Sequence, residues 1–151
     1  MSTNISNLED HLGYWLNLLA KQVEASFSLK LEKLNMTIAQ WVVLRSLYER
    51  ESTSLGELAE IINLDDSSLS RMVERLVQKG FVIREIDSKN RRAVKLRLTP
   101  QSTELVPKLA IQADENDVEF FKDISEKRKE EFLGTIKYII EKKGLIAKPK
   151  L

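Results

Sequence analysis

Hydrophobic residues recur every three or four positions along most of this chain, and this period indicates amphipathic helices. The predicted helices cover residues 7–34, about 38–49, 55–62, 66–79, 100–122 and 126–143. Apolar and polar residues alternate in two further stretches, 81–86 and 93–99, which predicts a pair of strands. The pattern therefore predicts a mainly α-helical fold with a small β-hairpin.

The longest predicted helix, residues 7–34, carries an apolar stripe along its whole length. The stripe consists of Leu8, Leu12, Leu16, Leu19, Val23, Phe27, Leu31 and Leu34. A stripe this long on a first helix needs partners on more than one side. It suits a helix shared between a folded domain and a dimer interface, and it equally suits a helix inside a core. Periodicity does not separate the two.

Polar residues mark the predicted helix starts, because their side chains can accept hydrogen bonds from the unpaired amides of a first turn. A Gln or Glu three residues after Thr37 and Ser54 completes a capping box at each. Asp65 suits the positive end of helix 66–79, and Gly80 suits its C-terminus. The predicted N-caps are Thr37, Ser54, Asp65, Thr99 and Ser125.

The order helix, short turn, helix and hairpin between Ser54 and Thr99 is that of a winged helix-turn-helix. In such modules the second helix of the pair, here residues 66–79, enters the major groove of DNA. Its first turn carries hydroxyl groups, which are small enough to approach phosphates and base edges closely. They belong to Ser67, Ser68 and Ser70.

Arg71 and Arg75 lie one turn apart on the outer face of the same predicted helix. A guanidinium group can bind guanine at O6 and N7, or it can hold a phosphate. The alternative is a solvated helix surface, on which Arg71 pairs with Glu74 or Arg75 pairs with Asp66. The basic hairpin that follows favours the DNA-binding interpretation.

The turn of the hairpin holds three cations within four residues, Lys89, Arg91 and Arg92. An arginine on a hairpin tip can enter a narrow minor groove, where A·T-rich sequence strengthens the negative potential. The alternative is a soluble turn whose charges prevent aggregation. With only Asp87 as a nearby acid, the first interpretation is favoured.

Charge is nearly balanced overall but is unevenly distributed. Residues 67–99 hold nine Lys and Arg against three Asp and Glu, whereas residues 104–141 hold six against ten. Residues 55–66 carry four acids and no base. A basic centre in an otherwise acidic chain is typical of a nucleic-acid footprint, although scattered solvated charges would give the same counts.

Composition narrows the classes of protein further. The 151 residues amount to about one domain, and the absence of cysteine excludes disulfides and thiol chemistry. No signal segment or long apolar run is present, so a soluble cytoplasmic protein is expected. One histidine, five glycines and no glycine-rich loop leave little for an enzyme to use. We therefore expect no enzyme, no catalytic residue, no metal site and no cofactor.

These features together resemble the MarR family of bacterial and archaeal transcription regulators. The resemblance covers about residues 8–143. The segments that carry it are Leu12-Gly13-Tyr14, Met36 to Leu44 with its Gln40-Trp41 pair, Gly56 to Ala59, Leu69 to Arg84, Asp87 to Arg92, and Leu96 to Pro100. No single segment is decisive, but the set in this order is highly specific.

The resemblance implies an obligate homodimer that binds double-stranded DNA. Residues 1–34 and 100–151 would form a helical dimerisation region, and residues 35–99 the winged helix-turn-helix, in one intertwined domain. Two recognition helices would then read a palindromic operator whose half-sites lie about one turn (~34 Å) apart. Family members commonly repress a nearby operon and are often released by an oxidant or by a small phenolic or other ligand.

The resemblance also implies a ligand pocket between the DNA-binding region and the dimerisation helices. Candidate lining residues are His11, Tyr14, Trp15 and Trp41. Each has a simpler interpretation, because His11 would be exposed at a helix start and the two tryptophans would belong to an ordinary core. The sequence identifies no effector.

Two positions depart from the family pattern. Asn90 stands where an acid usually precedes the wing arginine by two residues, which here is Arg92. An amide there loses the ion pair, so the wing is looser or Asp87 takes over. Ser102 stands where glycine is frequent, and we expect this change to matter little.

The main competing hypothesis is a winged-helix protein-interaction module that does not bind DNA.

Overall fold

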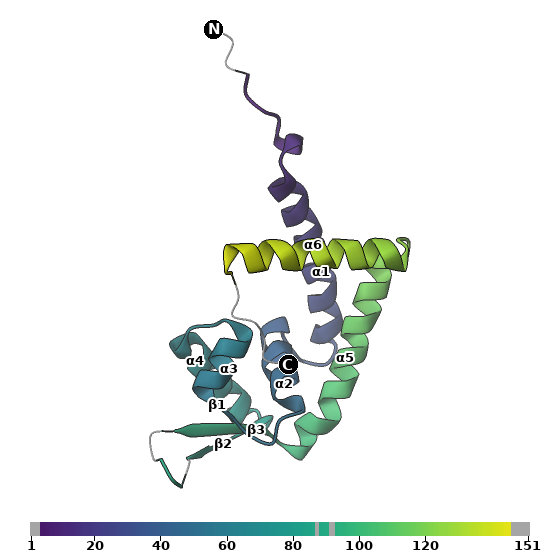
Figure 1. The fold of residues 1–151 in the computed structure, drawn as a ribbon. Helices are drawn as coiled ribbons and strands as arrows, with labels where there is room; N and C mark the ends of the chain where they lie inside the picture. Colours follow the sequence, from purple (N-terminus) through teal and green to yellow (C-terminus); the bar gives the residue numbers. More distant parts are fainter. Residues whose placement is uncertain (1–3, 87, 91–92, 146–151) are drawn as a thin grey trace.

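The computed structural model describes residues 4–86, 88–90 and 93–145, and within them it contains six α-helices, one short 3-10 helix and a three-stranded sheet (Figure 1). The elements in chain order are η1 (Leu8–Asp10), α1 (Leu12–Glu32), α2 (Ile38–Tyr48), β1 (Thr53–Ser54), α3 (Leu55–Ile62), α4 (Asp66–Gln78), β2 (Val82–Ile86), β3 (Val94–Leu98), α5 (Pro100–Phe121) and α6 (Glu126–Lys143). The predicted fold class, mainly helical with a small hairpin wing, is confirmed.

The prediction of one continuous helix over residues 7–34 is wrong at its start. The chain makes a 3-10 turn, and His11 is extended, with φ −100° and ψ 123°, before α1 begins. The His11 side chain makes no capping hydrogen bond. The indole N–H of Trp15 instead donates to the backbone oxygen of Glu9 at 2.9 Å, which holds the turn against the helix. Periodicity continues across such a break and so did not reveal it.

The predicted helix caps are all present. Thr37 and Gln40 exchange hydrogen bonds of 3.1 Å each, and Ser54 does the same with the residue three positions on. Asp65, Thr99 and Ser125 each accept a backbone N–H of the following first turn. Gly80 follows α4 with a φ of +79°, a left-handed conformation that glycine adopts without strain.

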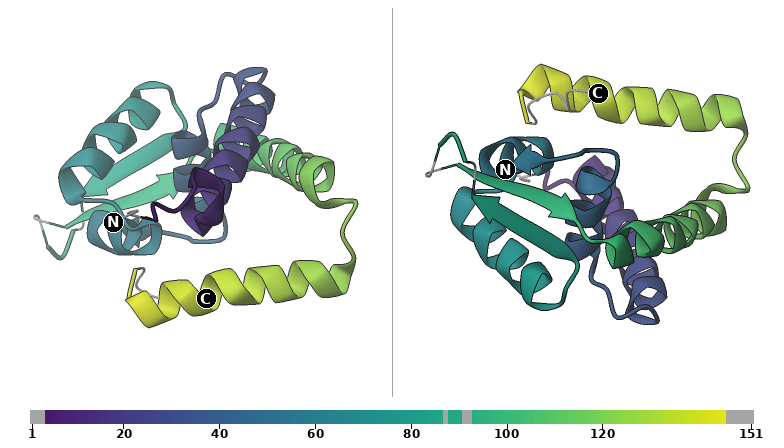
Figure 2. Two further views of the ribbon diagram at one scale, coloured as in Figure 1. Left: turned by 90° about the horizontal axis from the view of Figure 1, so that it is seen from above. Right: turned by 90° about the horizontal axis from the view of Figure 1, so that it is seen from below.

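The sheet has the order β1–β3–β2, and both pairings are antiparallel. The two-residue strand β1 was not predicted, because two residues carry no readable alternation. It exists because Thr53 pairs with Leu96 of β3. The central strand β3 therefore joins the hairpin to the segment that immediately precedes α3. Figure 2 shows the hairpin from two sides.

The core lies between α2, α3, α4, the sheet, the end of α1 and the start of α5, and we call this unit the lobe. Its buried apolar residues are Leu31, Met36, Val43, Leu44, Leu47, Leu58, Ala59, Leu69, Val73, Leu76, Val82, Leu96, Val106 and Leu109. Since α1 and α5 both contribute to this cluster, residues of the two predicted regions share one core. The predicted boundaries at residues 34 and 100 remain predictions.

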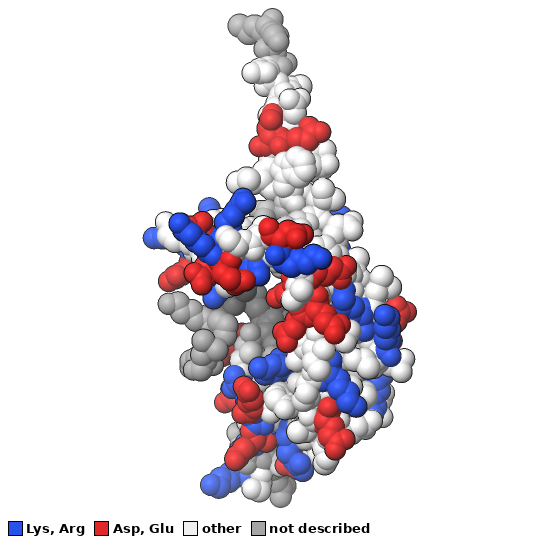
Figure 3. Space-filling view, turned by 90° about the vertical axis from the view of Figure 1, so that its right-hand side faces the viewer, with Lys and Arg blue, Asp and Glu red and all other residues white. Residues whose placement is uncertain are grey.

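Large apolar surfaces remain exposed outside the lobe. On α1, Leu12 is 81% exposed, and the apolar residues after it are also exposed as far as Leu19. The helix α6 has no buried residue, and its Leu133 and Tyr138 are 51% and 61% exposed. Figures 1 and 2 show α6 set apart from the lobe, and Figure 3 shows that the projecting part of α1 carries few charges. The first half of α1 is thus not a core helix of the single chain.

Candidate nucleic-acid interface

The first turn of α4 is organised by Asp65. Its Oδ1 accepts the Ser67 hydroxyl at 2.6 Å and the Ser68 backbone N–H at 2.9 Å. Together these hydrogen bonds hold the pKa of the Asp65 carboxyl far below its usual range, and the bond from the Ser67 hydroxyl contributes most. While its proton points at Asp65, Ser67 offers only lone pairs, which suit a base amino group better than a phosphate oxygen.

The inner face of α4 fixes its orientation, since Leu69, Val73 and Leu76 are all buried. Arg71 and Arg75 consequently lie on the exposed face, as predicted. Neither guanidinium pairs with any residue that the structure describes, so the alternative pairings with Glu74 and Asp66 are not observed. Both cations are available to a ligand. The hydroxyl-bearing Ser68 and Ser70 are partly buried beside them.

The start of α2 lies beside this face of α4, which the sequence did not indicate. Together the two helices line a hollow of about 350 Å³. Its lining residues are Thr37, Ala39, Gln40, Ser68, Arg71, Met72 and Arg75. The first amides of a helix have no partner inside that helix and carry partial positive charge. The hollow therefore combines two guanidinium groups with a positive helix end. The sequence revealed the capping box at the start of α2, but it did not reveal that this helix start lies beside α4.

The wing is formed by β2 and β3, with Val82 opposite Leu98 and Ile86 opposite Val94. Lys89 lies in the turn between them and is exposed. Asp87, Arg91 and Arg92 lie outside the described residues, so their predicted roles stay predictions.

One cation of the wing is neutralised within the hairpin. The Arg97 Nε and Nη2 atoms donate to Glu85 Oε1 at 3.0 and 2.8 Å. The nine cations counted over residues 67–99 therefore overstate the charge that is available to DNA. On another side of the molecule, where α5 is seen, acidic and basic side chains alternate without a basic patch (Figure 3).

The junction between wing and α5 is held by side-chain hydrogen bonds. The Thr99 hydroxyl donates to the Gly80 carbonyl oxygen at 2.8 Å, and the Ser102 hydroxyl donates to the Phe81 carbonyl oxygen. Ser102 is fully buried. The sequence did not indicate this role for the serine, whose hydroxyl ties the start of α5 to the start of the wing; that the serine matters little stays a prediction.

The four candidate effector residues are not brought together. His11 is exposed and shares a hydrogen bond with Ser6, and Tyr14 and Trp15 pack edge to face beside it. Trp41 packs edge to face on Phe27, which is 16 residues further along the chain than His11 and so about 24 Å along the helix. None of the four lines the groove of about 380 Å³ that runs between α1, α2, α5 and α6. No helix in the described ranges is long and apolar enough to cross a membrane.

Comparison with known proteins agrees with this geometry. The MarR family model matches residues 36–94, from the start of α2 into β3. The chain is 24% identical over 135 residues to the HTH-type transcriptional regulator SarZ of Staphylococcus haemolyticus, covering 89% of this chain and 90% of that protein.

Two solved structures share the fold over most of their length. The DNA complex of MepR from S. aureus superposes with a TM-score of 0.81 at 19% identity, covering 87% of this chain and 98% of that one. BpsR of Bordetella bronchiseptica, whose DNA binding is regulated by 6-hydroxynicotinic acid, gives 0.82 at 20% identity and covers 90% and 97%.

Proposed function

Because this chain belongs to the MarR family of transcriptional regulators, we propose that it acts as a homodimeric repressor that binds a palindromic operator near its own gene. The observation that carries the proposal is the pair of exposed guanidinium groups on α4, Arg71 and Arg75, which have no partner among the described residues. A buried apolar face holds their helix in one orientation, so the two cations are presented before DNA arrives.

In the proposed complex α4 lies in the major groove and the wing reaches the adjacent minor groove. Arg71 reads a base edge and Arg75 reads a base edge or a phosphate, with Ser67 close to a base amino group and Ser68 and Ser70 close to the backbone. The positive start of α2 supports Arg71 by attracting the same strand. At the wing, the proposed contacts are Lys89, Arg91 and Arg92.

The exposed apolar surfaces of α1 and α6 support the proposed homodimer. An exposed apolar surface of this extent marks an interaction site, and a second copy offers the same chemistry. Symmetric pairing of these helices would bury Leu12, Leu16 and Leu133 and place two α4 helices on one side of the dimer. Two half-sites about 34 Å apart would then be bound together.

Release by a small aromatic effector belongs to the same proposal. An effector relieves repression only when it binds better to a dimer whose recognition helices are wrongly spaced. Among the described residues, the apolar groove between α1, α2, α5 and α6 is the best candidate site for such a ligand, since Val23, Phe27 and Phe121 line it. BpsR supports the idea by its own regulation.

The test is a fluorescence-anisotropy titration of DNA from upstream of the gene against a scrambled duplex, at low and at raised salt. Preference that survives raised salt supports a specific regulator, because non-specific phosphate binding weakens steeply with salt. Equal, salt-sensitive binding to both duplexes would contradict repression at this site. Absence of binding would favour the protein-interaction module instead.

Arg71→Ala gives the residue-level test. The variant should lose about 5- to 150-fold in operator affinity, the equivalent of about 1–3 kcal/mol for a bidentate base contact, and should relax base preference at one position of each half-site. Lys79→Ala is the matched control, because it removes a cation from the other end of the same exposed surface. A uniform loss over all sequences would make Arg71 a phosphate contact.

A further inference from the structure

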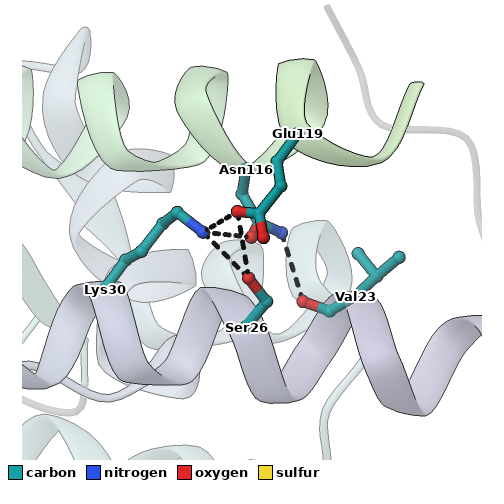
Figure 4. A network of polar contacts seen from close by, with 5 residues as sticks. All are labelled: Val23, Ser26, Lys30, Asn116 and Glu119. Carbon is teal, nitrogen blue, oxygen red and sulfur yellow. Dashed lines mark hydrogen bonds and ion pairs between the residues drawn. The ribbon is translucent and has the colours of Figure 1, made fainter. Parts of the chain in front are cut away.

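A lysine ammonium between α1 and α5 has every one of its three protons engaged. Lys30 Nζ donates to Ser26 Oγ at 2.8 Å, to Asn116 Oδ1 at 3.0 Å and to Glu119 Oε2 at 2.5 Å (Figure 4). Its side chain is only 19% exposed. We call Ser26, Lys30, Asn116 and Glu119 the polar clamp. It links residues that are almost ninety positions apart in the sequence.

Asn116 is held from both ends of its amide. Its oxygen accepts from Lys30, and its Nδ2 donates to the backbone oxygen of Val23 at 3.1 Å. The residue is only 3% exposed, so solvent cannot replace either bond. Because Val23 and Lys30 lie about two turns apart on α1, the amide fixes the position of α5 along α1 as well as its distance.

Glu119 completes the clamp at its outer edge. The pKa of the Glu119 carboxyl is lowered, mainly by the hydrogen bond from Lys30, so the ion pair stays charged at neutral pH. The Ser26 hydroxyl donates to the same oxygen at 3.4 Å. Since the Glu119 side chain is half exposed, it can be changed without leaving a buried cavity.

The polar clamp lies where both helices leave the lobe. On α1, Leu31 just after the clamp is buried in the lobe, whereas Leu19 before it is exposed. On α5 the order is reversed, since Leu109 before the clamp is buried and Val118 within its last turn is exposed. The clamp thus joins the lobe to the apolar helical segments that the proposed dimer would bury.

We propose that Lys30 and Asn116 are positioning residues, which set the placement of each lobe on the dimer and thereby the half-site spacing that the protein selects. Apolar helix interfaces can switch by one turn, about 5.4 Å. A network anchored on a buried amide, in which the three ammonium protons are all engaged, favours one register, and register selection is the best-attested role of buried polar groups. The proposal rests on the homodimer of the proposed function.

The absence of cysteine makes a direct measurement available. Gln78→Cys, at the exposed end of α4, gives one spin-label site per chain, and pulsed electron paramagnetic resonance then measures the distance between the two lobes of a dimer. The test variant is Lys30→Met with Asn116→Leu, which replaces the two groups by apolar side chains of similar shape. Lys21→Met, an exposed change on the same helix, is the matched control.

The control should give the narrow distance distribution of the parent chain. The test variant should give one that is shifted or broadened by about 5 Å, on the order of one helical turn. Its melting temperature should stay the same or rise, because apolar replacements of a buried pair are often neutral or stabilising. Operators selected from random DNA should keep the half-site and lose the preferred spacing. A merely structural role would move stability and leave the spacing unchanged.

The two proposals fail in distinguishable ways. Absence of any distance between labels in the parent chain would refute the homodimer, and this proposal with it. Equally narrow distances in the parent and the test variant would refute the clamp alone. If the double variant does not fold, Glu119→Ala decides the question, since it breaks the clamp at a half-exposed position and must also broaden the distribution.

Discussion

Ser102→Ala isolates the hydroxyl that ties α5 to the wing. This hydroxyl is fully buried and donates to the Phe81 carbonyl oxygen. That carbonyl keeps the Thr99 N–H, 3.2 Å away. The Thr99 hydroxyl, which lies 3.1 Å from Ser102 Oγ, keeps its bond to the Gly80 carbonyl oxygen, so neither partner of Ser102 is left unpaired. The free energy of unfolding should therefore fall by about 1 kcal/mol, the usual net value of one intramolecular hydrogen bond.

Ser102→Gly should cost more than Ser102→Ala. Glycine removes the same hydroxyl and is also about 1 kcal/mol less favourable than alanine within a helix. The expected order of stability is the parent chain, then alanine, then glycine. For a chain of this size each step corresponds to a melting temperature lower by about 2–4 °C.

Thermal and urea unfolding at one fixed protein concentration measure these steps, because oligomers have concentration-dependent stability. Thr103→Val is the matched control, since it removes an exposed hydroxyl bond, to the Thr99 carbonyl oxygen, in the same turn and should change stability by less than about 0.5 kcal/mol. A glycine variant as stable as the parent, or a control as damaging as Ser102→Ala, would refute the reasoning.

Three further outcomes are expected. Arg92→Ala should weaken operator binding while leaving the melting temperature nearly unchanged, and an unaltered affinity in the anisotropy assay would remove the wing arginine from the interface. Truncation after Ile124 removes α6 and should yield monomers in analytical ultracentrifugation; a stable dimer would contradict the role of that helix. Because the pKa of Asp65 is lower in the folded chain than its unfolded value of about 3.9, its cap stabilises the fold above that pH and is lost as pH falls. The free energy of unfolding of Asp65→Asn should therefore fall less steeply below pH ~4 than that of the parent. An identical pH dependence of the two proteins in this range would show that the carboxylate is not involved.

The sequence revealed what local chemistry decides. Helix starts at Thr37, Ser54 and Asp65 were predictable because a capping side chain and its amides lie within three residues of each other. The exposed face of α4 followed from the same principle, since the period of its apolar residues leaves Arg71 and Arg75 on the other side.

Features made by distant residues were not predictable. The strand β1 exists through its pairing with β3 more than forty residues later. The Lys30 to Asn116 contact joins residues 86 positions apart, and nothing local distinguishes Lys30 from Lys21 on the same helix. The hollow beside α4 depends on how α2 packs against it. The separation of Trp41 from the other effector candidates was not predictable for the same reason, because aromatic character does not place a side chain in a shared cavity.

The central strand β3 has a consequence for how DNA would be engaged. It pairs with β1, which leads directly into α3, and with β2, which follows α4 through Gly80. The helix α4 and the strands of the wing are thus parts of one packed unit, so the entropy of ordering them is lost during folding and not during any binding of DNA. Two individually weak contacts on such a unit act as a chelate: once one is made, the other forms at a high effective concentration. Removing either contact should then weaken the other as well.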